Sequence, residues 1–180
     1  MSRAAGGVDA TVDTRMLRQA LGTFATGVTV VTVGGDSPHG MTANAFTSVS
    51  LTPALVLICV DRNALMLDIL QSSRGFGISI LAHDQEHVAR HFADRRRPLG
   101  IAQFADVGWQ PGDLTGAPLI EDAVARFECR QWGTYVAGDH TIFVGELLSI
   151  DTSSEAEPLL FHRGKFGRTE PLALPTELAA

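Results

Sequence analysis

The sequence predicts a mainly β protein, an antiparallel β-barrel with appended helices, and three observations carry this prediction. About seven segments have the composition of strands, while only three short stretches show helical spacing. Strands and helices do not alternate as they would in a doubly wound parallel sheet, and no internal repeat is present. No GxGxxG follows a strand, so a dinucleotide would have to bind without a Rossmann fold.

The elements follow from local patterns. Asp13 or Thr14 can cap a first helix, whose apolar residues recur at helical spacing as far as Phe24. The β-branched run 28–33 predicts a strand, and the stretch 40–50 is expected to pair back on it after a turn. The remaining strands are expected at 54–60 (apolar throughout, hence buried on both faces), 76–81, 124–132, 140–150 and 159–162.

Two further helices and a long excursion complete the outline. Asn63 is the candidate cap of the second helix, and Asp84 is the candidate cap of a third helix that ends at Phe92. Residues 94–122 are rich in Pro, Gly and Asp, which predicts a mostly irregular segment with a functional or interfacial role. The basic run at 95–97 reads as a solvated turn, with a phosphate-binding patch as the alternative. The second helix is expected to carry Leu65, Leu67, Ile69 and Leu70, and the third is expected to face inward with Val88, Ala89 and Phe92.

Length and composition bound the kind of protein. The 180 residues, 45% of them hydrophobic, suit a single domain. We expect it to span residues 13–170, between a flexible leader at 1–12 and a C-terminal tail at 171–180. The net charge of −6 argues against nucleic-acid binding, and no stretch is long and apolar enough for a membrane span.

Two further observations bear on the compartment. The leader lacks the apolar block of a signal peptide. Cys59 and Cys129 lie in apolar, strand-like contexts that are typical of buried free thiols, although a disulfide between them stays open. A cytoplasmic location is therefore expected.

The stretch 40–50 (GMTANAFTSVS) is the strongest candidate for a binding segment. Its small side chains leave backbone N–H groups approachable, and its hydroxyls add uncharged donors. Such a segment can cradle a phosphate and bond the polar edge of a flat heterocycle, with an ordinary turn as the alternative. The polar residues of this stretch and its end are Thr42, Asn44, Thr47, Ser48, Ser50 and Thr52.

Histidines raise two other possibilities. Residues 83–87 (HDQEH) match the H-x-x-E-H pattern of some zinc hydrolases, and His91 extends the series. A cap at Asp84 would leave His83 outside the helix, so we expect a solvated helix face and no metal site. His140, in the block 138–146 (GDHTIFVGE), stands at a turn-to-strand boundary beside an acid. It could contact a cofactor carboxamide or deliver a proton, or be a surface histidine without a role.

Together these segments resemble the short-chain flavin reductases that serve two-component flavin-dependent monooxygenases. The resemblance covers about residues 15–168 of this sequence, as a series of blocks in the same order. The blocks are 24–33 (FATGVTVVTV), 40–50, 55–60 (LVLICV), 85–93 with its HFA ending, 127–129 (FEC), 138–146 and 158–166 (PLLFHRGKF).

The resemblance implies an FMN-binding split barrel, a Greek-key-like antiparallel barrel that forms a homodimer with flavin at the interface. It places 42–44 along the flavin ring, 48–50 and 59–61 at the ribityl chain and phosphate, and His140 on the nicotinamide side. This chain has Ala64 and Met66 where the family carries hydroxyls, so Arg62 or backbone N–H groups would replace them. The cofactor-binding residues implied are Thr42, Ala43, Asn44, Ser48, Val49, Ser50, Cys59, Val60, Asp61, Arg62, Asn63 and Ala64, with His140 as the catalytic residue.

The activity implied is an NAD(P)H:flavin oxidoreductase that reduces FMN or FAD and supplies reduced flavin to a separate monooxygenase component. Hydride transfer needs chiefly two flat rings held in register, so no nucleophile or metal is required. NADH is expected over NADPH because no Arg-rich site for a 2′-phosphate is identifiable. A non-catalytic flavin- or haem-binding split-barrel protein is the alternative. The homodimer interface is expected to include parts of the excursion 94–122.

Overall fold

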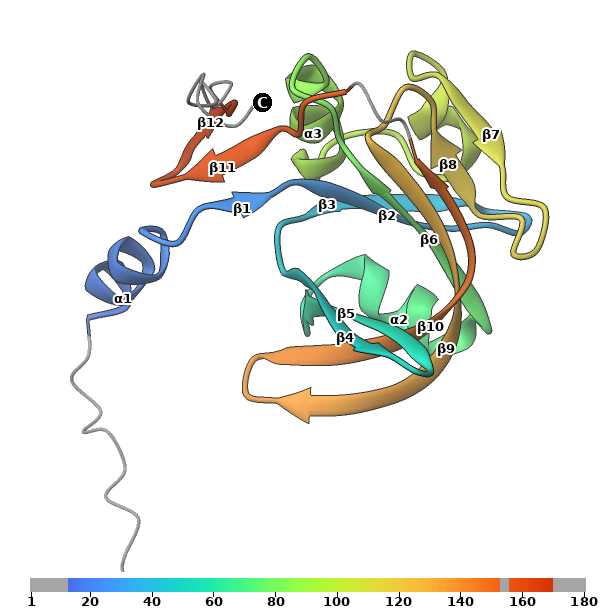
Figure 1. The fold of residues 1–180 in the computed structure, drawn as a ribbon, viewed down its shortest axis with the longest axis horizontal. Coiled ribbons are helices and arrows are strands. Elements are labelled where there is room, and N and C mark those ends of the chain that lie inside the picture. The colour runs from blue at the N-terminus through green and yellow to red at the C-terminus, as the bar shows by residue number, and fades with distance from the viewer. Residues whose placement is uncertain (1–12, 153–155, 170–180) are drawn as a thin grey trace, which may run out of the picture.

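The computed structural model describes residues 13–152 and 156–169, so the predicted leader at 1–12 and tail at 171–180 lie outside the described residues. Seven strands form one antiparallel sheet in the order β3-β2-β6-β9-β10-β5-β4. This sheet curls around an apolar interior (Figure 1). The prediction of a mainly β antiparallel barrel with appended helices is confirmed.

The elements run in a simple order along the chain. The strands are β1 (Thr26–Gly27), β2 (Thr29–Val33), β3 (His39–Ala43), β4 (Phe46–Leu51), β5 (Ala54–Asp61), β6 (Gly75–Ile80), β7 (Trp109–Pro111), β8 (Pro118–Ile120), β9 (Ala125–Ala137), β10 (His140–Thr152), β11 (Leu160–His162) and β12 (Lys165–Gly167). The helices are α1 (Thr14–Leu21), α2 (Leu65–Ser72), α3 (Glu86–Ala93) and the 3-10 helix η1 (Gly100–Phe104). The strands that the sequence did not predict, β1, β7, β8 and β12, have two or three residues each, too few to show an alternating pattern.

The stretch 40–50 links the two edges of the curled sheet instead of forming one strand. Its first part, in β3, pairs with β2 as predicted, but its second part, in β4, pairs with β5. Strands β3 and β4 are the two edges of the seven-stranded sheet, and only Asn44 and Ala45 separate them. Because an extended chain advances at most about 3.6 Å per residue, the two edges must approach each other there. The sheet therefore has to curl.

Strand β5 was expected to be buried on both faces, but only one of its faces is buried. Val56, Ile58 and Val60 are buried, whereas the residues between them are only half-buried. The curled sheet has one interior face, and alternate side chains of a strand point to opposite faces. The interior cluster includes Val31, Ile58, Phe76, Ile78 and Phe143.

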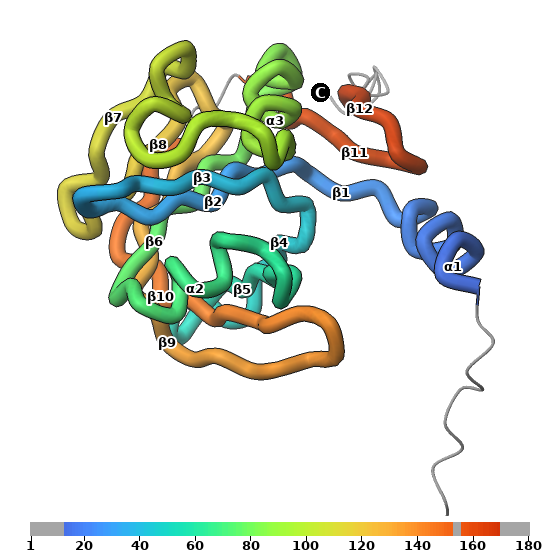
Figure 2. The backbone as a smooth tube through the Cα atoms, turned by 180° about the vertical axis from the view of Figure 1, so that it is seen from behind, coloured from blue at the N-terminus to red at the C-terminus, as the bar shows by residue number. Residues whose placement is uncertain are grey.

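Helix α1 begins as predicted, and its apolar side chains are exposed. The Asp13 carboxylate caps it by accepting a hydrogen bond from Arg15 N at 2.8 Å. No residue of α1 is buried, and Met16 and Leu21 are 65% and 66% exposed. In Figures 1 and 2, α1 stands off the barrel beside the β11–β12 hairpin. We call residues 13–24 and 160–169 together the arm.

The starts of α2 and α3 differ from the prediction. Asn63 does not cap α2, because its backbone N and its side-chain Nδ2 both donate to Asp61 Oδ1, at 2.8 and 3.1 Å. Helix α3 begins after Gln85 and not after Asp84. The Gln85 side chain is held by bonds to Ala82 N and Glu121 O. The buried residues of α2 are Met66 and Leu70, of which Leu70 is among the apolar residues expected in this helix. The buried residues of α3 are Val88, Ala89 and Phe92, as predicted.

The excursion 94–122 is more regular than predicted. It contains η1 and the β7–β8 hairpin. Phe104 of η1 packs with Phe92 of α3, at 5.2 Å between ring centroids, in a second core that also holds Leu81 and Ile120. This layer lies on the β2–β3 side of the barrel (Figure 2).

Three other findings concern the described part of the chain. Cys59 and Cys129 are free thiols. No helix there is long and apolar enough to cross a membrane. No three His, Cys, Asp or Glu side chains among the described residues gather as a metal-binding group, and His83 lies before α3.

Candidate functional site

Two adjoining cavities open where β3 ends. The first, of about 380 Å³, lies between the end of β5, the start of α2 and the residues after α3, and we call it the mouth cavity. The second, of about 470 Å³, lies under the β11–β12 hairpin, and we call it the hairpin cavity. Thr42 and Ala93 line both, so the two spaces are neighbours. The mouth cavity is lined by residues including Asp61, Asn63, Ala64, Arg95 and Arg97, and the hairpin cavity by residues including Asn44, Arg90, Phe161, Gly164 and Phe166.

Thr42 is fixed between the cavities by a bond to α3. Its Oγ1 donates to Ala89 O at 2.7 Å, which ties the end of β3 to the helix. Asn44, two residues on, is exposed at the point where the chain crosses from one sheet edge to the other. The block predicted to bind the flavin ring thus places the fixed Thr42 side chain and the accessible Asn44 amide on the wall of the hairpin cavity.

A polar cluster marks the opening of the barrel beside the mouth cavity. His140 opens β10 directly opposite Asp61, the last residue of β5. The Asp139 Oδ1 atom is 2.7 Å from His140 Nδ1, and Arg62 N donates to Asp139 O at 3.0 Å. The hydrogen bond from Asn63 N lowers the pKa of the Asp61 carboxyl, with further lowering by the charges of His140 and Arg95. Cations and amides are therefore grouped around an ionised carboxylate.

Arg95 and Arg96 are exposed in a turn, as predicted, but Arg97 is half-buried against the fold. Its guanidinium donates to Gly40 O and, at 2.8 Å, to Asp94 O, and it lies over the Phe92 ring at 5.8 Å. Burial lowers the pKa of Arg97. Arg95 is exposed at the rim of the mouth cavity. The sequence favoured a solvated turn at 95–97 and offered a phosphate-binding patch there only as the alternative, so neither residue was assigned to the site.

A buried glutamine holds the wall behind the mouth cavity. Gln103 is fully buried, accepts a bond from Gly40 N at 2.9 Å and donates to Pro38 O at 2.9 Å. His39 is buried beside it, and burial together with the nearby Arg97 charge lowers the pKa of His39 to about 4. The excursion is thus bonded to the strand that carries Thr42.

The hairpin cavity was not assigned by sequence reasoning. Phe161 and Phe166 face each other across the hairpin at 5.2 Å, and the Arg90 guanidinium lies 4.9 Å from the Phe166 ring centroid. Gly164 forms the turn with a positive φ of 78°, which suits glycine. Aromatic side chains and a cation on one wall suit a flat, anionic heterocycle. The tail block 158–166 and the block 85–93, which contains Arg90, carried the sequence signals for this wall.

The structure brings together only part of the predicted set. Ala43 and Val60 belong to the core, and Arg62 is exposed. Ser48 and Val49 are exposed on β4, where Ser48 pairs opposite Val56, well before the Asp61 end of β5. The members of the set that line the cavities are Thr42, Asn44, Asp61, Asn63 and Ala64; those that line neither are Ala43, Ser48, Val49, Ser50, Cys59, Val60, Arg62 and His140.

The cavities have the size and chemistry that a flavin and a nicotinamide require. Their volumes fall in the range of small-molecule sites, about 300–1,000 Å³. Their walls combine apolar surface with a few amides and cations, which is the usual composition of a cofactor site. A curled antiparallel barrel with such an opening defines a cofactor-binding barrel protein.

Comparison with known proteins supplies the family. The family model described as the flavin reductase like domain matches residues 21–170, and the chain belongs to that family. The NADH-dependent FAD reductase of Streptomyces globisporus is 52% identical over 159 residues, which cover 88% of this chain and 87% of the relative. The reductase subunit of a flavin-dependent monooxygenase from Mycobacterium tuberculosis is 34% identical, with 91% of this chain and 87% of that protein covered.

Solved structures agree. The NADH:FAD oxidoreductase of Streptomyces globisporus C-1027, in complex with NAD and FAD fragments, matches with a TM-score of 0.85 and 50% identity. The match covers 89% of this chain and 95% of that one. The flavin reductase component of a bacterial two-component tryptophan halogenase matches with a TM-score of 0.84 and 53% identity, over 87% of this chain and 98% of that one.

Proposed function

We propose that this chain is an NADH-dependent flavin reductase that reduces FAD or FMN and supplies the reduced flavin to a separate flavin-dependent monooxygenase component. The observation that carries the proposal is the pair of adjoining cavities that share Thr42. Together the two cavities can hold a flavin whose ring lies beside Thr42, and a nicotinamide can stack on that ring. The names of the relatives, one an NADH-dependent FAD reductase and one a monooxygenase reductase subunit, support the activity and the partner class.

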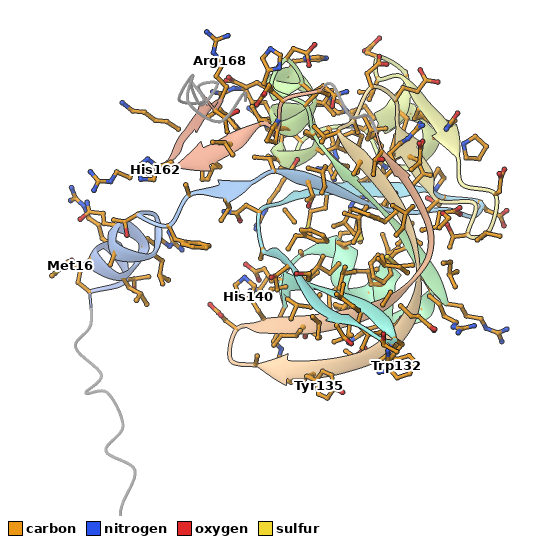
Figure 3. All side chains as sticks on the ribbon, in the orientation of Figure 1. Met16, Trp132, Tyr135, His140, His162 and Arg168 are labelled. Carbon is orange, nitrogen blue, oxygen red and sulfur yellow. The ribbon has the colours of Figure 1, made fainter. Side chains whose placement is uncertain are left out.

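The residues act by binding and orienting two rings. A bound flavin supplies the chemistry, accepting a hydride from NADH. Thr42 and Asn44 border the ring, and Asn63 with the backbone at the start of α2 holds the ribityl and phosphate end. His140, kept in place by Asp139, orders the nicotinamide at the open side of the barrel, where Figure 3 shows it. Stacking in register supplies most of the rate, because hydride transfer needs no acid at the flavin N5.

The direct test is anaerobic titration of the protein with FAD or FMN and then with NADH or NADPH. We expect NADH to bleach the visible absorbance of the flavin, with NADPH much less effective. Flavin that binds but is not reduced by either nucleotide would contradict the reductase and favour a non-catalytic flavin carrier.

The role of His140 has its own test. His140→Ala should lower kcat/KM for NADH by roughly 10–100-fold, about 1.4–2.7 kcal/mol, and leave flavin affinity nearly unchanged. His83→Ala, at an exposed position before α3, is the matched control. If His140→Ala reduces flavin at wild-type rates, at low and at saturating NADH, then His140 is an ordinary surface histidine without a role in the reaction.

We also propose a homodimer, because large apolar side chains are exposed on several elements. Trp132 and Tyr135 of β9 point outward (Figure 3), and Leu51 at the end of β4 is 92% exposed. Obligate dimer interfaces commonly bury more than about 2,000 Å². Leu99 and Ile101, which are exposed in the excursion, extend the proposed interface. A fully active monomer in light scattering at micromolar concentration would contradict the proposal.

The dimer gives the β4 residues a place in the site. Ser48, Val49 and Ser50 line neither cavity of their own protomer, so we propose that they complete the site at the interface. Ser48→Leu should raise the flavin dissociation constant tenfold or more, as expected for a lost hydrogen bond to a charged group. Thr47→Leu, on the neighbouring exposed position, is the control. Equal flavin affinity in both variants would show that Ser48 does not bind the flavin phosphate.

Two finer points complete the proposal. The free thiols Cys59 and Cys129 suit a reducing compartment, which supports the cytoplasm as the location. We place the domain at residues 13–170, and the family match at 21–170 supports this range.

A further inference from the structure

The arm concentrates positive charge on an acidic protein. The whole chain has a net charge of −6, whereas the arm carries five positive charges and one negative charge, that of Asp13. None of the five cations is in an ion pair with a described carboxylate. The cations are Arg15, Arg18, Arg163, Lys165 and Arg168, all of them exposed.

A groove connects this charge to the candidate site. The space between α1 and the hairpin turn measures about 1,030 Å³ and is lined by Arg15, Arg18, Arg163 and Gly164, among others. We call it the arm groove. Gly164 also lines the hairpin cavity, which in turn shares Thr42 with the mouth cavity. The arm groove therefore borders the hairpin cavity at Gly164, and the hairpin cavity borders the mouth cavity at Thr42.

The groove is built and held in place by the backbone. Arg163 N donates to Gly22 O at 2.8 Å, which joins the hairpin turn to the end of α1. Strand β1 pairs with β11, so the hairpin is also tied to the strand that leads into the barrel. Figure 3 shows polar side chains of both parts of the arm around this region, with Met16 and His162 as landmarks.

We propose that the arm groove binds the diphosphate of a dinucleotide whose ring occupies one of the two inner cavities. The proposal rests on the proposed function, which supplies NADH and FAD as the two dinucleotides. A nicotinamide that stacks on the flavin ring beside Thr42 leaves its diphosphate and adenosine to extend outward, and the arm groove is the space that borders the hairpin cavity at Gly164. The same diphosphate chemistry belongs to FAD, and the experiment below distinguishes the two.

The charge balance explains why such an arm is needed. A dinucleotide diphosphate carries two negative charges, and a protein of net charge −6 repels it at long range. The groove is lined by three arginines, which form no ion pair with a described carboxylate, and by the single acid Asp13. Guanidinium groups bind phosphate oxygens bidentately. The arm therefore raises dinucleotide affinity in a manner that salt weakens.

The test neutralises two groove cations without disturbing the fold. Arg18→Gln lies on an exposed helix face, and Arg163→Asn suits the positive φ of 50° at that turn. The double variant is compared with Arg74→Gln, an exposed cation that lines none of the three cavities. Replacement of both groove arginines by Lys keeps the charge and should retain most of the binding.

Equilibrium dissociation constants are measured for NADH, reduced nicotinamide mononucleotide, FAD and FMN, at low and high salt. We expect the double variant to bind one dinucleotide about tenfold more weakly at low salt, with a smaller difference at high salt. The mononucleotide that corresponds to that dinucleotide should bind to the double variant almost as tightly as it binds to wild type. A selective loss of NADH identifies the nicotinamide dinucleotide as the occupant, and a selective loss of FAD identifies the flavin.

The proposal is overturned if no dinucleotide affinity changes, or if the mononucleotides weaken as much as the dinucleotides. These measurements read binding and not turnover. A protein that binds dinucleotides through the arm but fails to reduce flavin would retain this inference and lose the proposed function.

Discussion

Acid should destabilise this protein through one buried imidazole, that of His39. The side chain is 5% exposed at the start of β3. Both ring nitrogens face donors, because Arg97 Nη2 is 3.3 Å from Nε2 and Gln103 Nε2 is 3.5 Å from Nδ1. Burial, reinforced by the charge of Arg97, lowers the pKa of His39 from 6.5 to about 4. A protonated ring would lie against a guanidinium and could accept no hydrogen bond.

The pH dependence of the free energy of unfolding follows from the different pKa values of His39 in the folded and unfolded states. The unfolded chain takes up the proton near pH 6.5, whereas the folded protein resists protonation until about pH 4. The stabilising contribution is therefore complete above pH 6.5 and falls as the pH drops toward 4. The gap between the two pKa values corresponds to at most about 3 kcal/mol, of which roughly 2 kcal/mol is lost by a pH of about 5.

The assay is urea unfolding of wild type and His39→Asn across this pH range. The Asn side chain is neutral and can accept a bond from Arg97, and the carboxylates titrate alike in both proteins, so their contributions cancel in the difference. We expect the free energy of unfolding to fall by about 2 kcal/mol more in wild type than in the variant between pH about 8 and pH about 5. Parallel pH profiles for the two proteins would refute the reasoning.

Three other substitutions or reagents probe the same structure. Burial alone would raise the pKa of Glu128, yet hydrogen bonds from Thr115 N, Thr115 Oγ1 and Leu114 N lower it. Because Glu128→Ala leaves these donors without their acceptor, it should lower the free energy of unfolding by about 2–3 kcal/mol, measured with urea at neutral pH. An unchanged midpoint would show that solvent satisfies those donors. Gly40→Ala should destabilise by about 1–3 kcal/mol in thermal melts, since its Cβ would stand 2.6 Å from Cε1 of Phe92, and a stable variant would require that ring to move freely. Burial raises the pKa of the Cys129 thiol to about 12, so a thiol reagent mapped by mass spectrometry should label it only after unfolding; labelling in the native state would contradict its burial.

Local sequence determined the elements whose signal lies in neighbouring residues. The β-branched run in β2 and the helical spacing of Val88, Ala89 and Phe92 in α3 report burial directly, and both predictions are confirmed. His140 was placed at a strand mouth from its turn-to-strand context, and it does open β10. The blocks that resemble flavin reductases were also present in the sequence itself, and the family follows from them.

Tertiary structure decided everything that depends on which distant groups meet. The residues 40–50 look like one strand, but only the closure of the sheet assigns β3 to one edge and β4 to the other. Asn63 has the side chain of a helix cap, yet Asp61 offers it a better acceptor.

The basic residues make the same point about the site. A run of three arginines at 95–97 reads as solvated. In the fold, however, the Arg97 guanidinium donates to the carbonyl of Gly40 and lies over the ring of Phe92. The cations of the arm come from the two ends of the sequence, and the bond from Arg163 to Gly22 brings them together. Residue patterns report local preference and burial, whereas cavities and charge clusters arise from contacts between residues far apart in the chain, which only the folded structure specifies.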